Sequence, residues 1–440
     1  MNHLFSRSAL AGAILIFLLG AKADQKVRPG ITTLLADSRV PITIACFGDS
    51  VTGVYYHTGG RRAWCDMLGI ALKRAYPRAQ LEMVNAGVSG DTTFDGLKRI
   101  QADVLAKRPN LVVVMFGMND VARVSLADYQ NNLAQIVKEC RSGGAKVILC
   151  TPNLIYAEDP HRPMARLAEF ADAVRRIGAE LRVPVADCYR RFEAIRSKSN
   201  FAWMALMSET IHPNMRGHIV IAEEVLRAIT GKRVSLGDVP PPFPIIPNTL
   251  SLLSKHALVR VLAMPPYDRF IGPALREISP DTHVDVTTWT VEGKSLAEIE
   301  EEGTRRNWLS LHPISPVEKP DLVITAIPSS ATAPTRKQFY RSYNGILNSC
   351  FSFAGFEWDV LAILPSVAER QQTSAQSASE MLALEAIKGH DIGWIARAPG
   401  DSATEYEIFS RWLRSQAKAS HDRQYILHAS ITSHDFRRSL

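Results

Sequence analysis

Two segments far apart in the sequence carry side chains that could act together as a nucleophile and its base. Ser50 ends a Phe-Gly-Asp-Ser motif that directly follows the apolar run 42–46, and segment 209–214 reads Glu-Thr-Ile-His-Pro-Asn. A serine hydroxyl is a poor nucleophile unless a base takes its proton and a third group orients that base. These residue types predict nucleophilic ester chemistry, with Ser50, His212 and Glu209 as the catalytic residues.

The elements that must position these residues alternate between strand-like and helix-like patterns from residue 40 to residue 232. Short runs rich in Val and Ile predict strands at 41–47, 81–85, 111–116, 146–151 and 183–187. Segments with a 3.6-residue apolar period predict helices at 61–76, 94–107, 126–141, 163–182 and 215–230. Strands that are apolar on both faces and alternate with helices indicate an α/β fold, with a parallel sheet covered by helices on both sides.

Three polar positions follow predicted strands of this sheet. Ser50, Gly90 and Asn119 each come shortly after an apolar run. Binding sites in parallel sheets form outside the carboxyl ends of the strands, so these residues are expected to converge. Hydrogen-bond donors at such a place could stabilise an oxyanion.

Four segments in this order resemble the SGNH/GDSL hydrolase family over residues 40–230: Gly-Asp-Ser at 48–50, Gly90 within 87–93, Gly-Met-Asn-Asp at 117–120, and 209–214. The resemblance implies a flavodoxin-like three-layer α/β/α sandwich and a serine esterase or lipase that needs no cofactor or metal. It also implies that Ser50 is the nucleophile and that His212 is the base. The oxyanion hole would consist of the backbone N–H groups of Ser50 and Gly90 and the side-chain amide of Asn119.

One position departs from the family pattern. The family usually has aspartate three residues before the histidine, whereas this chain has Glu209. Glutamate keeps the negative charge and can accept a hydrogen bond from a histidine ring, as it does in other serine hydrolases. The group that orients His212 is therefore Glu209, a backbone carbonyl, or no strong partner.

A proline-rich stretch predicts a boundary between two domains. Residues 233–250 include four prolines between 240 and 244 and a fifth at 247, which favours a stiff, extended linker. Segments 284–293, 320–328 and 359–365 of the second half align in order with 81–90, 109–117 and 146–152. This order indicates an internal duplication, in which 40–232 is the catalytic domain and 251–440 is a degenerate SGNH-like domain.

The second copy lacks the residues for this chemistry. Pro-Pro-Tyr at 265–267 replaces the Gly-Asp-Ser motif, and Ser330 stands where the first half has Asn119. His390 has no acid three residues before it. The second domain is therefore expected to be inactive.

The N-terminus has the features of a secretory signal peptide at 1–23. Arg7 supplies the positive charge, 9–20 is apolar, and Ala21 and Ala23 fit a cleavage site after Ala23. This predicts a secreted or periplasmic protein without stable membrane insertion after cleavage. The six cysteines could pair in an oxidising compartment, but two of them fall in predicted buried strands, where they suit small apolar side chains better.

Bulk composition narrows the functional classes. The formal charge of +7 is spread over scattered Arg pairs rather than one stripe, so nucleic-acid binding is not expected. Near the site, Tyr55, Tyr56, His57 and His161 are candidates for substrate contacts, because aromatic faces suit sugar rings. Together with the resemblance to the SGNH/GDSL family and the signal-like N-terminus, these aromatic residues predict an exported esterase that removes an acyl group, acetyl being favoured, from a glycan. The alternatives are a lysophospholipase or other lipid esterase, an acyltransferase that excludes water, and a glycan-binding protein without catalytic activity.

Overall fold

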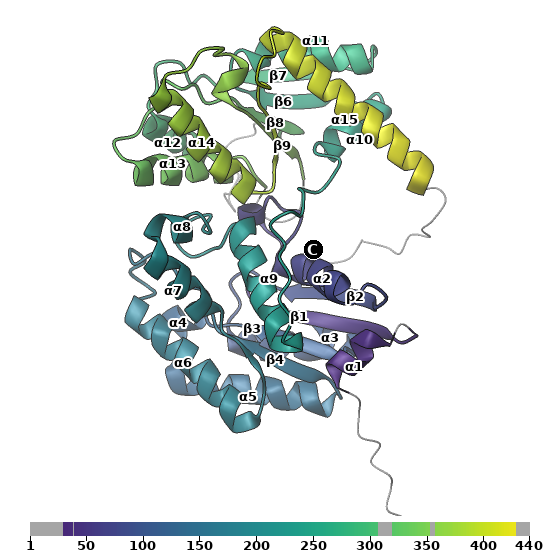
Figure 1. Ribbon diagram of the computed structural model, residues 1–440, viewed down its shortest axis with the longest axis vertical. Helices are drawn as coiled ribbons and strands as arrows, with labels where there is room; N and C mark the ends of the chain where they lie inside the picture. Colours follow the sequence, from purple (N-terminus) through teal and green to yellow (C-terminus); the bar gives the residue numbers. More distant parts are fainter. Residues whose placement is uncertain (1–29, 38, 307–318, 353–356, 428–440) are drawn as a thin grey trace, which may run out of the picture.

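The computed structural model describes residues 30–37, 39–306, 319–352 and 357–427, and it contains two parallel five-stranded sheets, each flanked by helices (Figure 1). The α/β class and the sandwich of helices around a parallel sheet are as the sequence predicts. The expected signal peptide at 1–23 lies outside the described residues.

The first sheet has the strand order β2-β1-β3-β4-β5. Its elements are, in chain order, α1 (Ile31–Ala36), β1 (Pro41–Gly48), α2 (Trp64–Ala75), β2 (Gln80–Gly87), α3 (Thr93–Asp103), β3 (Leu111–Met115), α4 (Asp120–Arg123), α5 (Leu126–Ser142), β4 (Lys146–Cys150), α6 (Met164–Leu181), β5 (Val185–Ala186), α7 (Cys188–Lys198), α8 (Asn200–Met204) and α9 (Met215–Thr230).

These elements agree with the sequence-based prediction for all five strands and five of the helices. Helices α7 and α8 and the short helices α1 and α4 were not predicted. Helix α7 is strongly polar, and only Cys188, Tyr189 and Phe192 on it are buried, so its apolar stripe is too short to stand out in the sequence.

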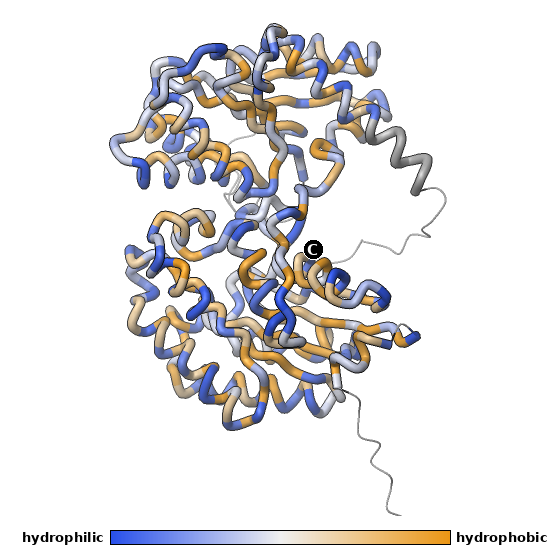
Figure 2. Tube along the Cα trace, in the orientation of Figure 1, coloured by the Kyte–Doolittle hydropathy of each residue, from blue (hydrophilic) through white to orange (hydrophobic). Residues whose placement is uncertain are grey.

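The register of the sheet aligns the ends of its central strands. Gly48 at the end of β1 pairs with Gly87 of β2 and with Met115 of β3. The loops that follow these strands therefore leave the sheet at one level, at its carboxyl edge. The strands themselves form the core: every residue of β3 is buried, and the hydropathy colouring shows apolar residues concentrated on the strands and the inner faces of the helices (Figure 2).

The second sheet repeats this topology. Its order is β7-β6-β8-β9-β10, so each strand takes the place of its counterpart in the first sheet. The elements are α10 (Pro247–Ser254), β6 (Val259–Ala263), α11 (Tyr267–Ile278), β7 (Val284–Thr288), α12 (Leu296–Arg306), β8 (Leu322–Thr325), α13 (Arg336–Ser349), β9 (Asp359–Ile363), α14 (Ser374–Gly389), β10 (Gly393–Ile395) and α15 (Glu405–Leu427).

The segments aligned at the sequence level fall on equivalent strands: β2 with β7, β3 with β8, and β4 with β9. Two sheets of the same strand order fit a duplication, and common descent of the two halves stays a prediction.

The connection between the halves is held against the first half. The guanidinium of Arg61 donates to the backbone carbonyls of Pro242 and Pro244, and Arg62 donates to that of Pro240. Prolines have no N–H to donate but keep their carbonyl acceptors. Helix α10 begins at Pro247, so the last residues of the predicted linker are helical.

All six cysteines are buried and free. They act as small apolar core residues, as expected for Cys46 and Cys150. Within the described ranges, none of the helices combines the length and the apolar composition needed to cross a membrane.

Candidate active site

The structure brings Ser50, His212 and Glu209 into one hydrogen-bonded chain. The Ser50 Oγ lies 2.8 Å from His212 Nε2, and His212 Nδ1 lies 2.5 Å from Glu209 Oε1. These residues come from the end of β1 and from the turn before α9, which are separated by more than 150 residues. The arrangement has the order nucleophile, base and orienting acid that serine acyl transfer requires.

Glu209 is held by its own turn. Its carboxylate accepts hydrogen bonds from the backbone N–H of His212 at 2.7 Å and of Ile211 at 3.3 Å. Burial raises the pKa of Glu209, but the charge and hydrogen bonds of His212 outweigh this effect and leave that pKa below its ordinary value. The carboxylate is therefore ionised and can only accept, so His212 carries its proton on Nδ1 and presents a free Nε2 lone pair to Ser50.

A tight turn presents Ser50 at the end of β1. The backbone N–H groups of Thr52 and Gly53 donate to the Asp49 carbonyl, and that of Val51 donates to the Asp49 carboxyl oxygen at 2.9 Å. Asp49 is buried, and burial raises its pKa to about 7. Asp49 therefore orders the turn that carries Ser50.

Two backbone donors next to Ser50 are unused. Within the described part of the chain, neither the N–H of Ser50 nor that of Gly90 donates a hydrogen bond. Gly90 has φ +82°, and a Cβ built on it would meet nothing within 4 Å. Glycine is therefore required here for its left-handed backbone and not for lack of room.

The Asn119 side chain is fixed by two neighbours. Its Nδ2 donates to the Asp91 carbonyl at 3.0 Å, and its Oδ1 accepts from Arg162 Nη2 at 3.4 Å. Only one Nδ2 hydrogen is used, so the other can point at an oxyanion. The sequence did not predict this contact of Arg162, because no local pattern connects residues 43 positions apart.

His57 requires a correction. It was expected to contact substrate, but its side chain is only 1% exposed. Its ring stacks on that of His212, with centroids 4.4 Å apart and planes 20° apart, and its other face lies toward His218 at 5.9 Å. A residue buried among aromatic rings cannot bind substrate from solution, so His57 supports the catalytic histidine from behind.

His57 and His218 are both uncharged. Burial lowers the pKa of His57 well below its ordinary value, and the neighbouring histidines lower it further. Burial also lowers the pKa of His218 to about 3, and its Nδ1 accepts from the Trp64 N–H at 2.9 Å. The Ser50 backbone acts in the opposite direction and raises the pKa of His57, but this is the smallest of the effects. In the described structure, neither ring nitrogen of His57 has a hydrogen-bond partner of normal geometry. His212 is thus backed by neutral imidazole rings.

The other three residues that were expected to contact substrate, Tyr55, Tyr56 and His161, are less buried than His57. The Tyr55 hydroxyl accepts from the Ser89 N–H at 2.8 Å, which ties it to the loop carrying Gly90. Tyr56 is half-buried, with its ring 5.4 Å from that of His57. His161 is exposed, and its backbone N–H donates to Asp159. Substrate contacts by Tyr55, Tyr56 and His161 stay predictions.

Comparison with known proteins identifies the family of this chain. Residues 46–220 match the GDSL-like lipase/acylhydrolase family. The uncharacterized lipoprotein YqeF of Bacillus subtilis is 31% identical over 179 residues, which cover 34% of this chain and 71% of that protein. The chain belongs to the GDSL-like lipase/acylhydrolase family. As a member of this family, it is a carboxylic ester hydrolase with an ester as its substrate.

Two further proteins are similar to part of this GDSL hydrolase. An acetylxylan esterase of Geobacillus stearothermophilus is 29% identical over 169 residues, covering 36% of this chain and 76% of the relative. The solved structure of a lipase/acylhydrolase from Enterococcus faecalis is 30% identical, covers 44% of this chain and 97% of that chain, and gives a TM-score of 0.38. The family match ends at residue 220, before the second sheet begins.

Proposed function

We propose that this GDSL hydrolase is an exported serine esterase that removes a short acyl group, acetyl in particular, from a carbohydrate. The observation that carries the catalytic assignment is the continuous chain from Ser50 Oγ to His212 (2.8 Å) and from His212 to Glu209 (2.5 Å). The acetyl and carbohydrate parts are supported by the similarity to an acetylxylan esterase. Export is supported by the signal-like sequence at 1–23.

The proposed reaction follows from the hydrogen bonds. Ser50 Oγ attacks the ester carbonyl carbon while its proton passes to His212 Nε2, and the ionised Glu209 stabilises the imidazolium that forms. His212 then gives the proton to the leaving alcohol, which leaves an acyl-Ser50 ester. A water molecule whose proton is taken by His212 attacks this ester and releases the carboxylic acid and free Ser50.

The developing oxyanion would be bound by three donors. Among the residues that the structure describes, nothing accepts from the N–H groups of Ser50 and Gly90, and one Nδ2 hydrogen of Asn119 is left over. Each donor in such a hole typically contributes about 3–4 kcal/mol to transition-state stabilisation. The reaction as written requires no metal or organic cofactor.

The test compares the mature protein with Ser50→Ala on the p-nitrophenyl esters of acetate, butyrate and octanoate, and then on an acetylated xylo-oligosaccharide. We expect rapid turnover of the acetyl esters that falls by at least about 1,000-fold in Ser50→Ala. Octanoate as the best substrate would contradict the acetylesterase proposal and favour a lipid esterase. Equal rates for wild type and variant on every ester would refute the role of Ser50.

A further inference from the structure

The turn that carries Glu209 and His212 is fastened from both sides. Within the turn, the Ser208 N–H donates to the His212 carbonyl at 2.9 Å. At its tip, the first half holds it, since the Tyr156 N–H donates to the Thr210 carbonyl at 2.9 Å and Asn153 donates to the Ile211 carbonyl at 3.1 Å. At its base, the turn is held by residues of the second half.

Asn348, in α13 of the second half, forms two hydrogen bonds with Ser208, the residue that precedes Glu209. Its Oδ1 accepts from the Ser208 hydroxyl at 2.9 Å, and its Nδ2 donates to the Ser208 carbonyl at 3.2 Å. Ser208 is 2% exposed and Asn348 7% exposed, so water does not compete for these bonds. Two bonds to one residue restrain both its position and its rotation.

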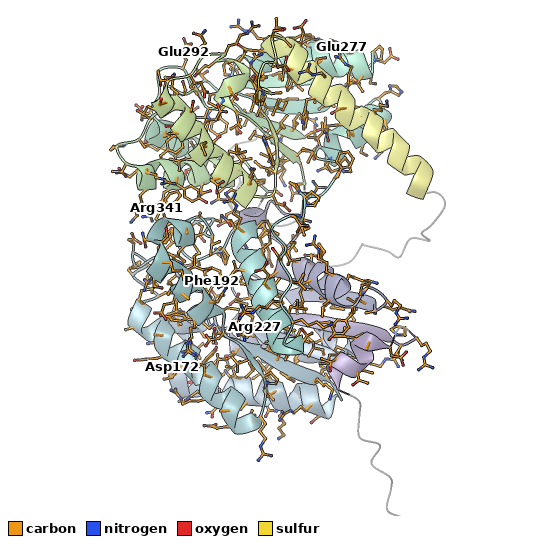
Figure 3. The ribbon with its side chains drawn as sticks, viewed as in Figure 1. Asp172, Phe192, Arg227, Glu277, Glu292 and Arg341 are labelled. Carbon is orange, nitrogen blue, oxygen red and sulfur yellow. The ribbon has the colours of Figure 1, made fainter. Side chains whose placement is uncertain are left out.

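Other contacts from the second half support the same turn. The Tyr340 hydroxyl donates to the Ala205 carbonyl at 3.3 Å. Gly389, at the end of α14, approaches Asn214 so closely that a Cβ there would lie 2.6 Å from Asn214 Nδ2. Figure 1 shows α13 and α14 facing α8 and α9 across the border between the halves, and Figure 3 places Arg341 of α13 at this border.

The second half also covers the loop behind His212. A Cβ on Gly59 would lie 2.6 Å from the His390 carbonyl, and Arg62 forms an ion pair of 2.6 Å with Asp391 that is almost fully shielded from solvent. The loop 53–60 contains His57, which stacks on His212. The second half therefore touches both supports of the catalytic histidine.

We propose that the second half is a built-in part of the catalytic apparatus, and that Asn348 is a positioning residue which, through Ser208, holds Glu209 in register with His212. The inference rests on the proposed function of Ser50, His212 and Glu209. A displacement of about 1 Å in a catalytic constellation can cost about 100-fold in rate, so a restraint on the residue next to Glu209 acts directly on turnover.

A contact that only held the two halves together would not need two specific hydrogen bonds between Asn348 and Ser208. Packing alone would be served by an apolar pair at positions 208 and 348, whereas here Asn348 uses its acceptor and a donor on Ser208. By contrast, Lys337 and Arg341 form ion pairs with Glu158 on partly exposed side chains, where such pairs contribute little.

The experiment uses the full chain and measures kcat and KM for p-nitrophenyl acetate, well below the thermal midpoint of each variant. Asn348→Leu keeps the approximate volume and removes both bonds to Ser208. We expect kcat to fall about 10- to 100-fold with KM changed less than about twofold. Ser208→Ala, which keeps the bond from Asn348 to the Ser208 carbonyl, should lose less. The double variant should be no slower than Asn348→Leu, because both changes remove the same interaction.

Ser349→Ala is the matched control. Ser349 is buried beside Asn348, but its hydroxyl donates to the Ile346 carbonyl within α13 and does not reach the turn. It should lower the thermal midpoint without lowering kcat. A kcat for Asn348→Leu within twofold of Ser349→Ala would overturn the inference; if Asn348→Leu does not fold, an unchanged kcat in Ser208→Ala would overturn it. Wild-type turnover that does not depend on Ser50 would instead refute the proposed function.

Discussion

Replacing Glu209 by glutamine measures how much its negative charge contributes to catalysis, because the turn fixes the conformation of this side chain. Oε1 accepts from His212 Nδ1 and also from the His212 backbone N–H at 2.7 Å. In Glu209→Gln, the amide oxygen must occupy this place, since an NH₂ group there would face two donors. The His212 tautomer is therefore retained and only the negative charge is lost.

The size of the effect follows from the electrostatics of this pair. Two unit charges about 4 Å apart interact by about 4 kcal/mol at an effective dielectric constant of about 20. The Glu209 side chain is 32% exposed, so solvent screens part of this interaction and about 3 kcal/mol remains. We expect kcat to fall about 100- to 1,000-fold, which is less than the roughly 10,000-fold typical when the histidine tautomer is also lost.

The assay is steady-state hydrolysis of p-nitrophenyl acetate, with thermal unfolding followed by circular dichroism. KM should stay within about twofold, because Glu209 contacts His212 and not the ester. Glu158→Gln is the control: Glu158 is a half-exposed glutamate whose ion pairs lie at the border of the halves. A loss of less than about tenfold in Glu209→Gln would show that Glu209 does not stabilise the imidazolium, and would refute the reasoning.

Two further substitutions test the loops around Ser50. Gly90→Ala should lower kcat about tenfold or more: the left-handed φ of +82° costs alanine about 1 kcal/mol, and its relief would turn the N–H away from the oxyanion. Unchanged kcat with p-nitrophenyl acetate would exclude this N–H as a donor. Asp49→Asn should stabilise the protein at alkaline pH: with a folded-state pKa of about 7, the contribution of Asp49 to stability is fully present below its unfolded pKa of about 4 and is lost as pH rises through 7. Urea unfolding at pH 5 and pH 8 should show a gain that grows toward an upper limit of about 4 kcal/mol; a gain that does not depend on pH would contradict the buried-acid interpretation.

Much of the first half could be predicted because its signals are local. The runs of Val and Ile in β1, β3 and β4 are buried on both faces, so their composition alone marks them as central strands of a parallel sheet. Ser50, Asn119 and His212 stand in short motifs whose order along the chain was informative. Helix α7 escaped prediction because its packing against α8 and α9, rather than its own periodicity, determines which side chains are buried.

The contacts around His212 could not be predicted from local signals in the sequence. His57 lies in a loop with two tyrosines that the sequence presented as a surface for sugars, yet the fold turns its ring under His212. Arg162 reaches Asn119 from 43 residues away, and Asn348 reaches Ser208 from 140 residues away. Sequence spacing carries no trace of such contacts, because each depends on how separate elements pack in three dimensions.

The amino-acid sequence was thus sufficient for the α/β class, the strands and the types of residue that the chemistry needs, since these follow from local apolar patterns and short motifs. Only the tertiary structure decided that Glu209 is the partner of His212, because a carboxylate with one more methylene can meet the ring only if the turn has the right shape. That shape depends on hydrogen bonds from both halves of the chain. By its sequence, the second half is predicted to be a degenerate copy that lacks the catalytic residues. Its proposed role follows only from the tertiary structure, in which α13 contacts the turn that carries Glu209 and His212.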